Sequence, residues 1–549
     1  MTHSKFDISN LCRKTSASVL SLGMILSGCT SSPGTYSVSG GSGNSASTAI
    51  KHVVVIFGEN ISFDHYFGTY PNAANPTGEP PFHALAGTPA VNGLTQALLS
   101  SNPNASNSTN GKGATNPFRL DHADAATADQ DHSYTPEQMA FDNGKMDLFP
   151  ASVGTAGAPA GAPAPANTTG LTMGYYDGDT VTAMWNYAQH FALNDASFGT
   201  NFGPSTDGAL NLVSGQLNGV AANINGTGSV VSDGSGGLTL MSDADPMGDA
   251  CSTTTGESLR MGGTNVGDLL NAANVTWGFF EGGFDLTATN SNGTTGCKRS
   301  TTSAITGVTE TDYIPHHEPF QYYTSTQNLA HTRPSSVAMI GHQGDAANHQ
   351  YDINDFYTAV NAGNMPSVSY LKAPGYEDAH AGYSDPLDEQ TFVVHVINFL
   401  QSTPYWSSTA VVIAYDDSDG WYDHVMNPIV NPSTTAKDML TATGQCGNGA
   451  TALPGIAAGT AHAQGRCGYG PRLPLLVISP WAKANYVDST VTDQSSVLRF
   501  VEDVFLKGQR IGQGSFDSIA GPLDNMFDFS KGAPQNTTKL LLDETTGEP

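Results

Sequence analysis

The nine residues from Asp416 to His424 read DDSDGWYDH and hold four acids and one histidine, directly after the apolar run Ala410–Tyr415. An apolar run of this length, rich in β-branched residues, predicts a buried strand, so its end would deliver carboxylates into the interior. Carboxylates that lie this close together repel one another and are costly to remove from water. We expect a positive charge among them, and our hypothesis is a divalent metal ion.

A second group of oxygen ligands follows another apolar run. Lys51–Phe57 is followed by Gly58, Glu59 and Asn60. Together with Asp416 and Asp417, Glu59 and Asn60 offer hard oxygen atoms, which suit Ca²⁺, Mg²⁺, Mn²⁺ or iron better than a thiolate-type zinc site. Either pair alone is more often a turn or a helix cap. Their common position after buried strands favours one bound divalent metal ion.

A hydroxyl group that suits a nucleophile follows a Gly-Pro turn. Gly203-Pro204-Ser205-Thr206 leads into a short apolar run that is typical of a helix. Ser205 would lie at the helix N-terminus, where free amides and the helix dipole favour an anion. A serine at this point can accept a phosphoryl group, although such a residue alone is more often an N-cap.

Three loop-like segments contain histidines: Asp131–Tyr134, His316–Phe320 and Asp378–Tyr383. A histidine can orient a phosphoryl group or protonate a leaving group, whereas a lone loop histidine is usually exposed to solvent. The candidates for chemistry are His132, His317 and His380. No chemical role is assigned to His52, His342, His349, His395 and His424.

Buried strands alternate with amphipathic helices along the chain. Strand-like runs occur at 51–57, 275–280, 367–371, 410–415 and 473–478, and helical patterns at 392–400 and 494–505, the second with Asp493 as N-cap. This alternation predicts an α/β fold with a mostly parallel central sheet flanked by helices. Ligands of such sheets bind beyond the carboxyl ends of the strands, where Glu59 and Asp416 would meet. Residues 74–170 and 215–265 are predicted to be long loop insertions near the site.

Four motifs in the same order resemble the bacterial phosphoesterase family. They are Gly58–Gly68, Gly203–Ser205, His317–Phe320 and Tyr415–Val425, within roughly residues 50–505. The family contains non-haemolytic phospholipases C and a branch of acid phosphatases, and it belongs to the alkaline-phosphatase-like superfamily.

The resemblance implies a role for each matching residue. Glu59, Asn60, Asp416 and Asp417 would hold the metal ion, and Ser205 would be the nucleophile that forms a phosphoserine. His132, His317 and His380 would bind the phosphoryl oxygens or protonate the leaving group. The motifs do not decide which histidine is the general acid, and His316 is an alternative to His317.

The resemblance also shows departures. Phospholipase members usually have Thr in place of Ser205 and Asp-Glu in place of Asp416-Asp417, so this chain looks more like the acid phosphatase branch. Asp207 stands where the family often has Pro. We therefore expect a metal-dependent acid phosphatase. A phospholipase C acting on phosphatidylcholine-like lipids is the alternative, and a catalytically silent surface binding protein is the second.

A phospholipase C of that kind would need an apolar rim or an aromatic cage for choline. Seven aromatic residues are candidates for such a cage or for core packing: Tyr175, Tyr176, Trp185, Phe320, Tyr322, Tyr323 and Trp421.

The N-terminus is typical of an exported lipoprotein. Residues 1–28 have a basic start and a short apolar stretch, and Leu26-Ser27-Gly28-Cys29 resembles the bacterial lipobox. Residues 29–49 would be a flexible tether, 50–530 the catalytic domain and 531–549 a C-terminal tail. The expected location is the cell envelope, in the periplasm or at the outer membrane, or outside the cell after release. Contact with a membrane would come only through a lipid on Cys29.

The charge of the chain limits its expected binding partners, and its cysteine content indicates disulfides. The chain has 21 Lys and Arg against 49 Asp and Glu, a formal charge of −28. This excess of acids argues against nucleic acid and against electrostatic binding to anionic membranes. The expected partner is a small phosphate ester or a phospholipid.

Four cysteines in the exported part indicate disulfides, and of three connectivities we predict Cys251–Cys297 and Cys446–Cys467.

Overall fold

The computed structural model describes residues 46–156, 164–226, 228–433, 437–440, 446, 453–456, 462–464 and 466–549. The predicted signal peptide, Cys29 and most of the tether lie outside these residues. The chain separates into two units, residues 1–42 and 43–549, and the described residues belong to the second.

An eight-stranded sheet forms the centre of this unit, and the predicted fold class is confirmed. Its strand order is β14 (Gln350–Asp352), β11 (Trp277–Glu281), β15 (Val368–Lys372), β1 (His52–Gly58), β16 (Thr409–Tyr415), β19 (Leu475–Ile478), β4 (Ala192–Asn194) and β20 (Tyr486–Asp488). The strands from β14 to β16 are parallel neighbours, and β19 runs antiparallel to both β16 and β4.

The helices of this unit are α1 (Ala46–Ala49), α2 (Phe63–Phe67), α3 (Gln96–Ser100), α4 (Pro103–Ser106), α5 (Tyr134–Phe141), α6 (Phe149–Ser152), α7 (Thr182–His190), α8 (Ser205–Ser214), α9 (Val266–Ala272), α10 (Ile353–Asn361), α11 (Pro386–Ser402) and α12 (Gln494–Phe505). Shorter strands outside the main sheet are β2 (Phe118–Arg119), β3 (Gly174–Tyr175), β5 (Ser197–Phe198), β6 (Val220–Ile224), β7 (Val230–Ser232), β8 (Leu238–Leu240), β9 (Asp245–Pro246), β10 (Ser258–Met261), β12 (Ser300–Thr302), β13 (Thr309–Thr311), β17 (Pro454–Gly455), β18 (His462–Ala463) and β21 (Thr492–Asp493).

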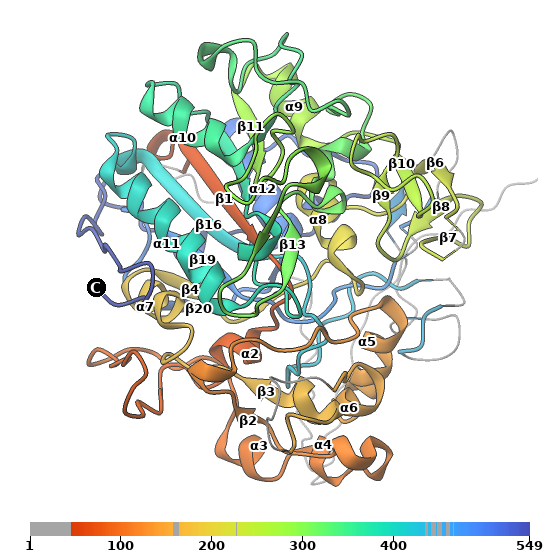
Figure 1. Cartoon of the computed structure of the whole chain (residues 1–549), viewed down its shortest axis with the longest axis vertical. Coiled ribbons are helices and arrows are strands. Elements are labelled where there is room, and N and C mark those ends of the chain that lie inside the picture. The colour runs from red at the N-terminus through yellow and green to blue at the C-terminus, as the bar shows by residue number, and fades with distance from the viewer. Residues whose placement is uncertain are drawn as a thin grey trace, which may run out of the picture. The chain divides into compact units, whose positions relative to one another are not determined.

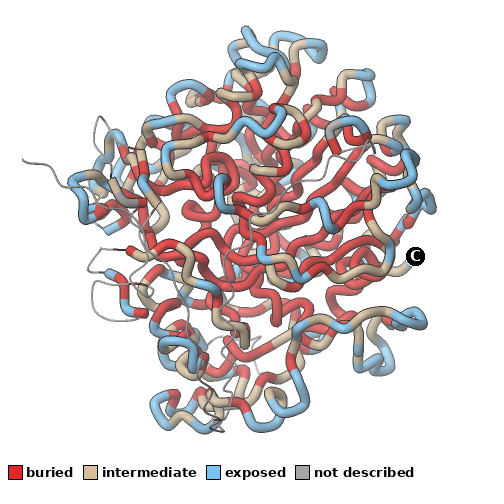
Figure 2. The backbone as a smooth tube through the Cα atoms, turned by 180° about the vertical axis from the view of Figure 1, so that it is seen from behind, coloured by how far each residue is buried: buried red, intermediate tan, exposed pale blue. Residues whose placement is uncertain are grey.

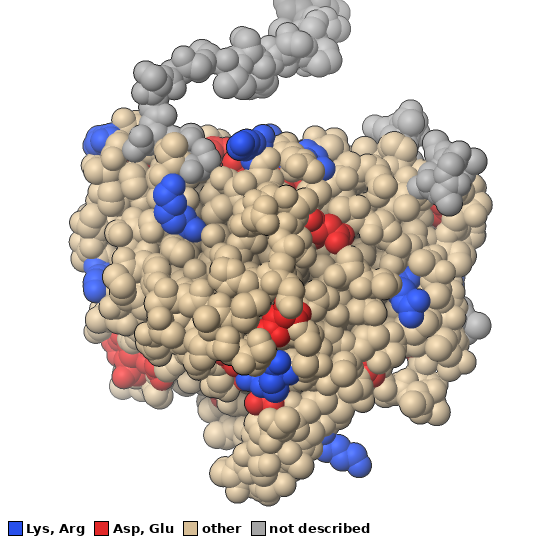
Figure 3. Space-filling model, turned by 90° about the horizontal axis from the view of Figure 1, so that it is seen from above, with Lys and Arg blue, Asp and Glu red and all other residues tan. Residues whose placement is uncertain are grey.

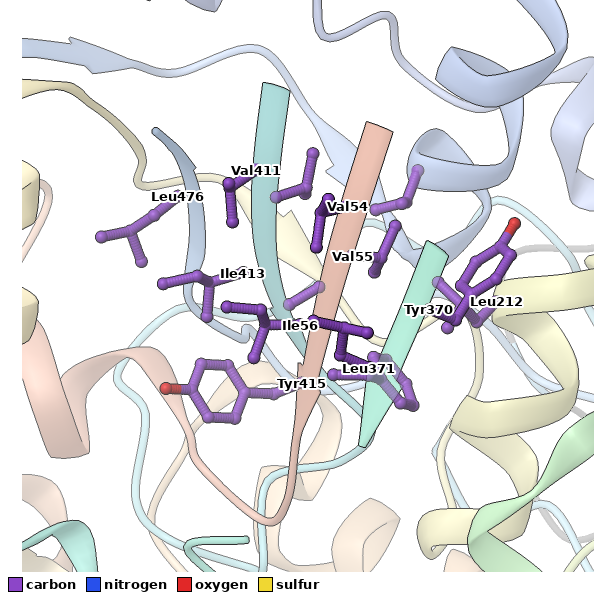
Figure 4. Close-up of a cluster of buried hydrophobic side chains, with 14 of the residues drawn as sticks. Val54, Val55, Ile56, Leu212, Tyr370, Leu371, Val411, Ile413, Tyr415 and Leu476 are labelled. Atoms are coloured by element: carbon purple, nitrogen blue, oxygen red, sulfur yellow. The ribbon is translucent and has the colours of Figure 1, made fainter. Parts of the chain in front are cut away.

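Both faces of the central strands are covered by helices. Val55 and Tyr370 are register partners on β1 and β15, and they point toward Leu212 of α8, whereas Ile56 and Ile413 point to the other face (Figure 4). On that other face Glu389 of α11 accepts a hydrogen bond from Tyr415 Oη at 2.5 Å. Each fully buried aliphatic side chain of this kind contributes about 1.5–3 kcal/mol to the free energy of unfolding. Burial on both faces explains why these strands are continuous apolar runs.

The helix ends follow local sequence signals. Asp493 is the N-cap of α12, as predicted, and its side chain accepts a hydrogen bond from the Ser495 N–H. Helix α11 begins earlier than its apolar pattern suggests, because Asp385 caps it and Pro386 occupies its first turn.

The two predicted insertions contain more structure than loops alone. Residues 74–170 include α3 to α6, which Figure 1 shows gathered below the sheet together with α2. Their apolar side chains form a second buried cluster that includes Tyr134, Phe149 and Phe202 as well as Tyr422 from the motif after β16. Residues 215–265 contain the small strands β6 to β10. The first insertion therefore packs directly against the end of the sheet that carries the candidate site.

The last residues of the chain are part of the fold. Leu540 and Leu542 belong to the main core cluster, and Gln401 of α11 both donates to and accepts from the Leu540 backbone, at 2.7 and 2.8 Å. Figure 2 shows the buried backbone filling the interior, with exposed residues in the peripheral loops.

Both predicted disulfides, Cys251–Cys297 and Cys446–Cys467, are present. No helix in the described part of the chain is long and apolar enough to cross a membrane. On the face shown in Figure 3, Lys and Arg side chains lie singly among other residues and form no basic patch.

Candidate active site

The predicted oxygen ligands meet at the carboxyl ends of β1 and β16. Gly58 and Tyr415 are register partners at the ends of these parallel strands, so Glu59 and Asp416 leave the sheet side by side. The Asn60 N–H donates to Asp416 Oδ1 at 2.8 Å. Asn60 has a φ of +61°, a left-handed conformation that asparagine tolerates better than most residues. The structure thus brings together residues that are more than 350 positions apart in the chain.

Ser205 lies in the same cluster as the first residue of α8. Its Oγ is 2.8 Å from Glu59 Oε2, 3.1 Å from Asp417 Oδ2 and 3.5 Å from Asn60 Oδ1, and the residue is 2% exposed. The positive end of the helix dipole therefore faces the carboxylates. A Cβ at Gly208, one turn along α8, would lie 2.2 Å from the Asp416 carbonyl oxygen. Glycine at this position allows the helix to approach the loop after β16.

Lys372 is a member of the cluster that the sequence analysis missed. It is the last residue of β15, its ammonium group contacts Glu59 Oε1, and it is 1% exposed. Burial lowers the pKa of Lys372, but the charges of Glu59, Asp416 and Asp378 outweigh this effect and raise it. Its position one residue beyond the predicted strand 367–371 was the available signal. The positive charge expected among the acids is therefore supplied in part by the chain itself.

The carboxyl groups of the cluster differ in their environment. Burial, followed by the charge of Asp416, raises the pKa of Glu59 well above its usual range. Burial also opposes ionisation of Asp416, but its hydrogen bond with Glu59 and the charge of Lys372 lower its pKa. Asp416 Oδ2 is buried and has no hydrogen-bond partner among the described residues. A buried, charged oxygen without a partner fits a site that holds a cation.

His317 lies on the Lys372 side of the cluster. Its Nδ1 is 3.5 Å from Glu59 Oε1 and 3.9 Å from Asp378 Oδ2, and burial lowers its pKa well below the usual value. Its Nε2 is buried and has no partner in the described part of the chain. His316 instead faces Asp245 at 3.9 Å and is more exposed. Of the two alternatives, the structure places His317 next to Glu59.

His132 and His380 lie together beside Asp419. Their ring centroids are 5.8 Å apart, and His132 Nδ1 is 3.4 Å from Asp419 Oδ1. Burial lowers the pKa of His132, but the charges of Asp417, Asp419 and Asp129 raise it well above its usual value. Asp419 Oδ1 also accepts a hydrogen bond from Asn60 Nδ2 at 3.1 Å, so this pair is linked to the oxygen ligands.

Three groups of side chains among the described residues have ligand atoms within 4.8 Å of one another. One joins His132 and His380 to Asp129 and Asp419 beside the site. The second contains Cys251, whose sulfur is in a disulfide. In the third, which includes His424, Asp64 and Asp423 are each 3.0 Å from Arg472, so a guanidinium already compensates part of their charge. The predicted set of Glu59, Asp416 and Asp417 is not among the three groups.

A cavity of about 400 Å³ lies beside His132 and Pro204, the residue before Ser205. Its lining is polar, apart from Pro204: Asp129, Gln130, Asp131, His132, Ser133, Thr155, Ser242 and Asp243. A larger cavity of about 450 Å³ between α10 and α11 contains none of the predicted site residues.

Six of the seven candidate aromatic residues belong to the core. Six are at most 2% exposed: Tyr176, Trp185, Phe320, Tyr322, Tyr323 and Trp421. Trp421 stacks on His65 with ring centroids 4.0 Å apart. Tyr175 lines a different cavity, next to Arg119.

Comparison with known proteins shows which family the chain resembles along most of its length. The profile of the phosphoesterase family matches residues 50–506. The chain belongs to the phosphoesterase family. It is 26% identical over 512 residues to a non-hemolytic phospholipase C of Burkholderia pseudomallei, a match that covers 91% of this chain and 62% of the relative. It is 25% identical over 514 residues to phospholipase C A of Mycobacterium tuberculosis, covering 90% and 80%.

The chain spans only about three fifths of the length of the first of these relatives (62%). Among solved structures, a protein in the alkaline phosphatase superfamily from Vibrio parahaemolyticus is similar with a TM-score of 0.26 and 10% identity, over 59% of this chain and 60% of that one.

Proposed function

We propose that the protein is an exported, metal-dependent phosphoric ester hydrolase of the acid phosphatase type, with Ser205 as its nucleophile. The observation that supports this proposal is the position of Ser205 Oγ. It lies at the start of α8, within 3.1 Å of carboxylates that follow β1 and β16. A hydroxyl surrounded by acids at a helix N-terminus is suited to attack phosphorus once a cation is present.

Glu59, Asn60, Asp416 and Asp417 would hold one divalent metal ion. All four offer oxygen atoms, and Asp416 Oδ2 lacks a partner in the described structure, so the donor set fits Ca²⁺, Mg²⁺, Mn²⁺ or iron. When bound, such an ion would lower the pKa of the Ser205 hydroxyl and stabilise charge on the phosphoryl oxygens. The Lys372 ammonium group contacts Glu59 Oε1, and Glu59 Oε2 accepts a hydrogen bond from Ser205 Oγ.

Residues of the chain itself would make the new bond and transfer the protons. Ser205 Oγ attacks phosphorus, the bond from phosphorus to the leaving oxygen breaks, and the hydroxyl proton passes to Glu59 or Asp417. The leaving alcohol takes a proton from one of the three histidines. Water then attacks the phosphoserine and gives a proton to the same histidine, phosphate departs, and Ser205 recovers its proton from Glu59 or Asp417. His132, His317 and His380 would bind the phosphoryl oxygens or serve the leaving group.

The surroundings of the site support a small, soluble phosphate ester. The cavity beside Pro204 has a polar lining, and six of the seven residues considered for a choline cage are packed in the core. Phospholipase C activity on phosphatidylcholine-like lipids is the second candidate, because the relatives reported above bear that name. A catalytically silent surface binding protein is the third.

Turnover of two substrates separates these candidates. Protein lacking residues 1–29 is given an aryl phosphate monoester and an aryl phosphorylcholine diester, each with and without a chelator. Faster, chelator-sensitive hydrolysis of the monoester supports the phosphatase, and preference for the diester supports the phospholipase C. Absence of turnover of both, across acidic and neutral pH with several metals, supports the silent binding protein.

Loss of the nucleophile tests the intermediate directly. Wild-type protein quenched in acid during turnover of an isotope-labelled monoester should carry label on Ser205, and Ser205→Ala should carry none and lose turnover. Full turnover by Ser205→Ala would exclude this nucleophile.

Export and anchoring are part of the same proposal, based on the residues before position 30. Cys29→Ser should abolish incorporation of labelled fatty acid in bacterial cells, whereas Cys251→Ser should retain it. Equal labelling of wild type and Cys29→Ser would contradict the lipid anchor.

A further inference from the structure

Glu137 is a buried carboxyl group beside the site that the proposed chemistry does not use. It lies on α5 and is 1% exposed. Its Oε2 accepts a hydrogen bond from the Gly203 N–H at 2.9 Å, and its Oε1 accepts one from Ser418 Oγ at 2.7 Å. Gly203 is two residues before Ser205, and Ser418 follows Asp417 directly. One carboxylate therefore bridges the turn before the nucleophile and the loop of the proposed metal ligands.

Burial of Glu137 in this arrangement is unfavourable for the stability of the fold. No Lys or Arg in the described part of the chain lies within ion-pair distance of Glu137. Burial raises the pKa of Glu137 to about 8, although its two hydrogen bonds and the charge of His132 act in the opposite direction. A buried ionisable group without an ion-pair partner is usually less stabilising than a well-packed apolar side chain. Its use at this position points to a requirement of the site.

The turn before Ser205 depends on contacts from outside. Gly203 has a φ of +121°, which only glycine adopts easily, and a Cβ there would lie 2.4 Å from Asp207 Oδ2. Pro204 is the N-cap of α8 and provides no side-chain hydrogen bond. Glu137 supplies a fixed acceptor to this turn.

The bridge also includes the histidine side of the site. Ser133 is the N-cap of α5, so the helix that carries Glu137 begins two residues after His132. The carboxylate thus ties together three segments that are distant in sequence, with separations of 66 residues to Gly203 and 281 to Ser418.

We propose that Glu137 is a positioning residue that holds the Ser205 turn at a fixed place relative to Asp416 and Asp417. This inference rests on the proposed function, because it assumes that Ser205 must be aligned with ligands on the second loop. Displacement of a nucleophile by about 1 Å can reduce the rate about 100-fold.

The test compares two substitutions at this position in the protein without residues 1–29. Glu137→Ala removes both hydrogen bonds and should lower kcat about 100-fold with little change in KM, because the alignment and not the binding of the substrate is lost. Glu137→Gln should restore most of kcat, because its amide oxygen can accept from Gly203 and its NH₂ group can donate to Ser418. Equal losses in both variants would overturn the positioning role, since geometry alone would then not explain the effect.

Glu502→Ala is the matched control. Glu502 is a carboxyl group on α12 with 0% exposure, and it accepts a hydrogen bond from the Ile511 N–H at 3.1 Å, outside the site. This variant should lose thermal stability but keep the wild-type kcat per folded molecule.

Hydrogen exchange gives a readout that needs no activity. Peptides covering residues 199–206 should exchange faster in Glu137→Ala than in wild type, Glu137→Gln or Glu502→Ala. Unchanged exchange together with wild-type kcat in Glu137→Ala would overturn the inference.

If Glu137→Ala does not fold, Ser418→Ala removes one of the two hydrogen bonds. It should show the same decrease in kcat and the same faster exchange, both smaller in size. Wild-type protein without hydrolase activity would contradict the proposed function, while the exchange comparison would still test the bridge.

Discussion

At the residue scale, the acids after β16 are balanced in part by a single lysine. Lys372 contacts Glu59, and its charge also acts on Asp416 and Asp378, inside a region where all four residues are buried. Removal of one partner from a buried ion pair leaves an uncompensated charge, which destabilises a protein far more than loss of an exposed pair.

Lys372→Gln should therefore lower the free energy of unfolding by about 3–5 kcal/mol when a chelator is present. Urea unfolding followed by tryptophan fluorescence measures this difference. Lys145→Gln is the control, because Lys145 is 68% exposed in its pair with Asp142, and its loss should change the free energy of unfolding far less. Similar effects of the two substitutions would show that Lys372 does not compensate the acid cluster.

Asp416 is the residue on which the proposed metal site most depends, because its Oδ2 is buried without a partner in the described structure. Asp416→Asn keeps the shape but removes the charge, and it should weaken metal binding by more than about tenfold, the lower limit usual for changes just outside a metal site. Calorimetric titration with Mn²⁺ measures the affinity without any need for turnover. Unchanged affinity and stoichiometry would exclude Asp416 as a ligand.

At the element scale, the site depends on how closely α8 approaches the loop after β16. Gly208 faces the Asp416 backbone, where no Cβ fits. Alanine is normally the better residue inside a helix, by about 1 kcal/mol. The requirement for close packing opposes this preference at this one position.

Gly208→Ala should reduce kcat about 100-fold, because α8 and Ser205 must move away from Asp416. Circular dichroism should remain that of wild type, and kcat is measured on the faster of the two aryl substrates. Thr358→Ala on the exposed side of α10 is a control for helix propensity and should leave kcat unchanged. Wild-type kcat in Gly208→Ala would mean that the contact does not position the nucleophile.

At the scale of the whole molecule, much of the acidic charge lies inside. Among the described residues, acidic side chains are buried far more often than Lys and Arg, of which Arg299, Lys372, Arg466 and Arg472 are buried. Burial raises the pKa of Glu389 to about 7, of Asp385 to about 8 and of Glu502 to about 9. These groups keep protons in the folded state that they lose in the unfolded state.

Stability should therefore fall as the pH rises from 6.5 to 8.5. A carboxyl group with a raised pKa stabilises the folded state fully below its unfolded pKa, and this contribution is lost as the pH approaches the folded value. Each such group contributes about 1.4 kcal/mol per pH unit within its window. Thermal unfolding across this range measures the trend, and Glu502→Gln should make it shallower. A melting temperature that rises with pH would contradict the prediction.

The sequence by itself determined the elements whose signals are local. Continuous apolar runs predicted β1, β15 and β16, Asp493 predicted the start of α12, and acids directly after two strands predicted that Glu59 and Asp416 lie close together. Strands β4, β14 and β20 have three residues each, which is too short for a periodic signal, and they form only because neighbouring strands offer hydrogen-bond partners.

The tertiary structure decided which distant side chains share one environment. Lys372 meets Glu59 across 313 residues, and Glu137 meets Ser418 across 281. Neither contact leaves a trace in composition or periodicity, because packing of the whole core sets the distance between residues so far apart in the chain. The contact of Lys372 with Glu59, and the hydrogen bonds by which Glu137 links Gly203 to Ser418, are therefore visible only in the folded molecule.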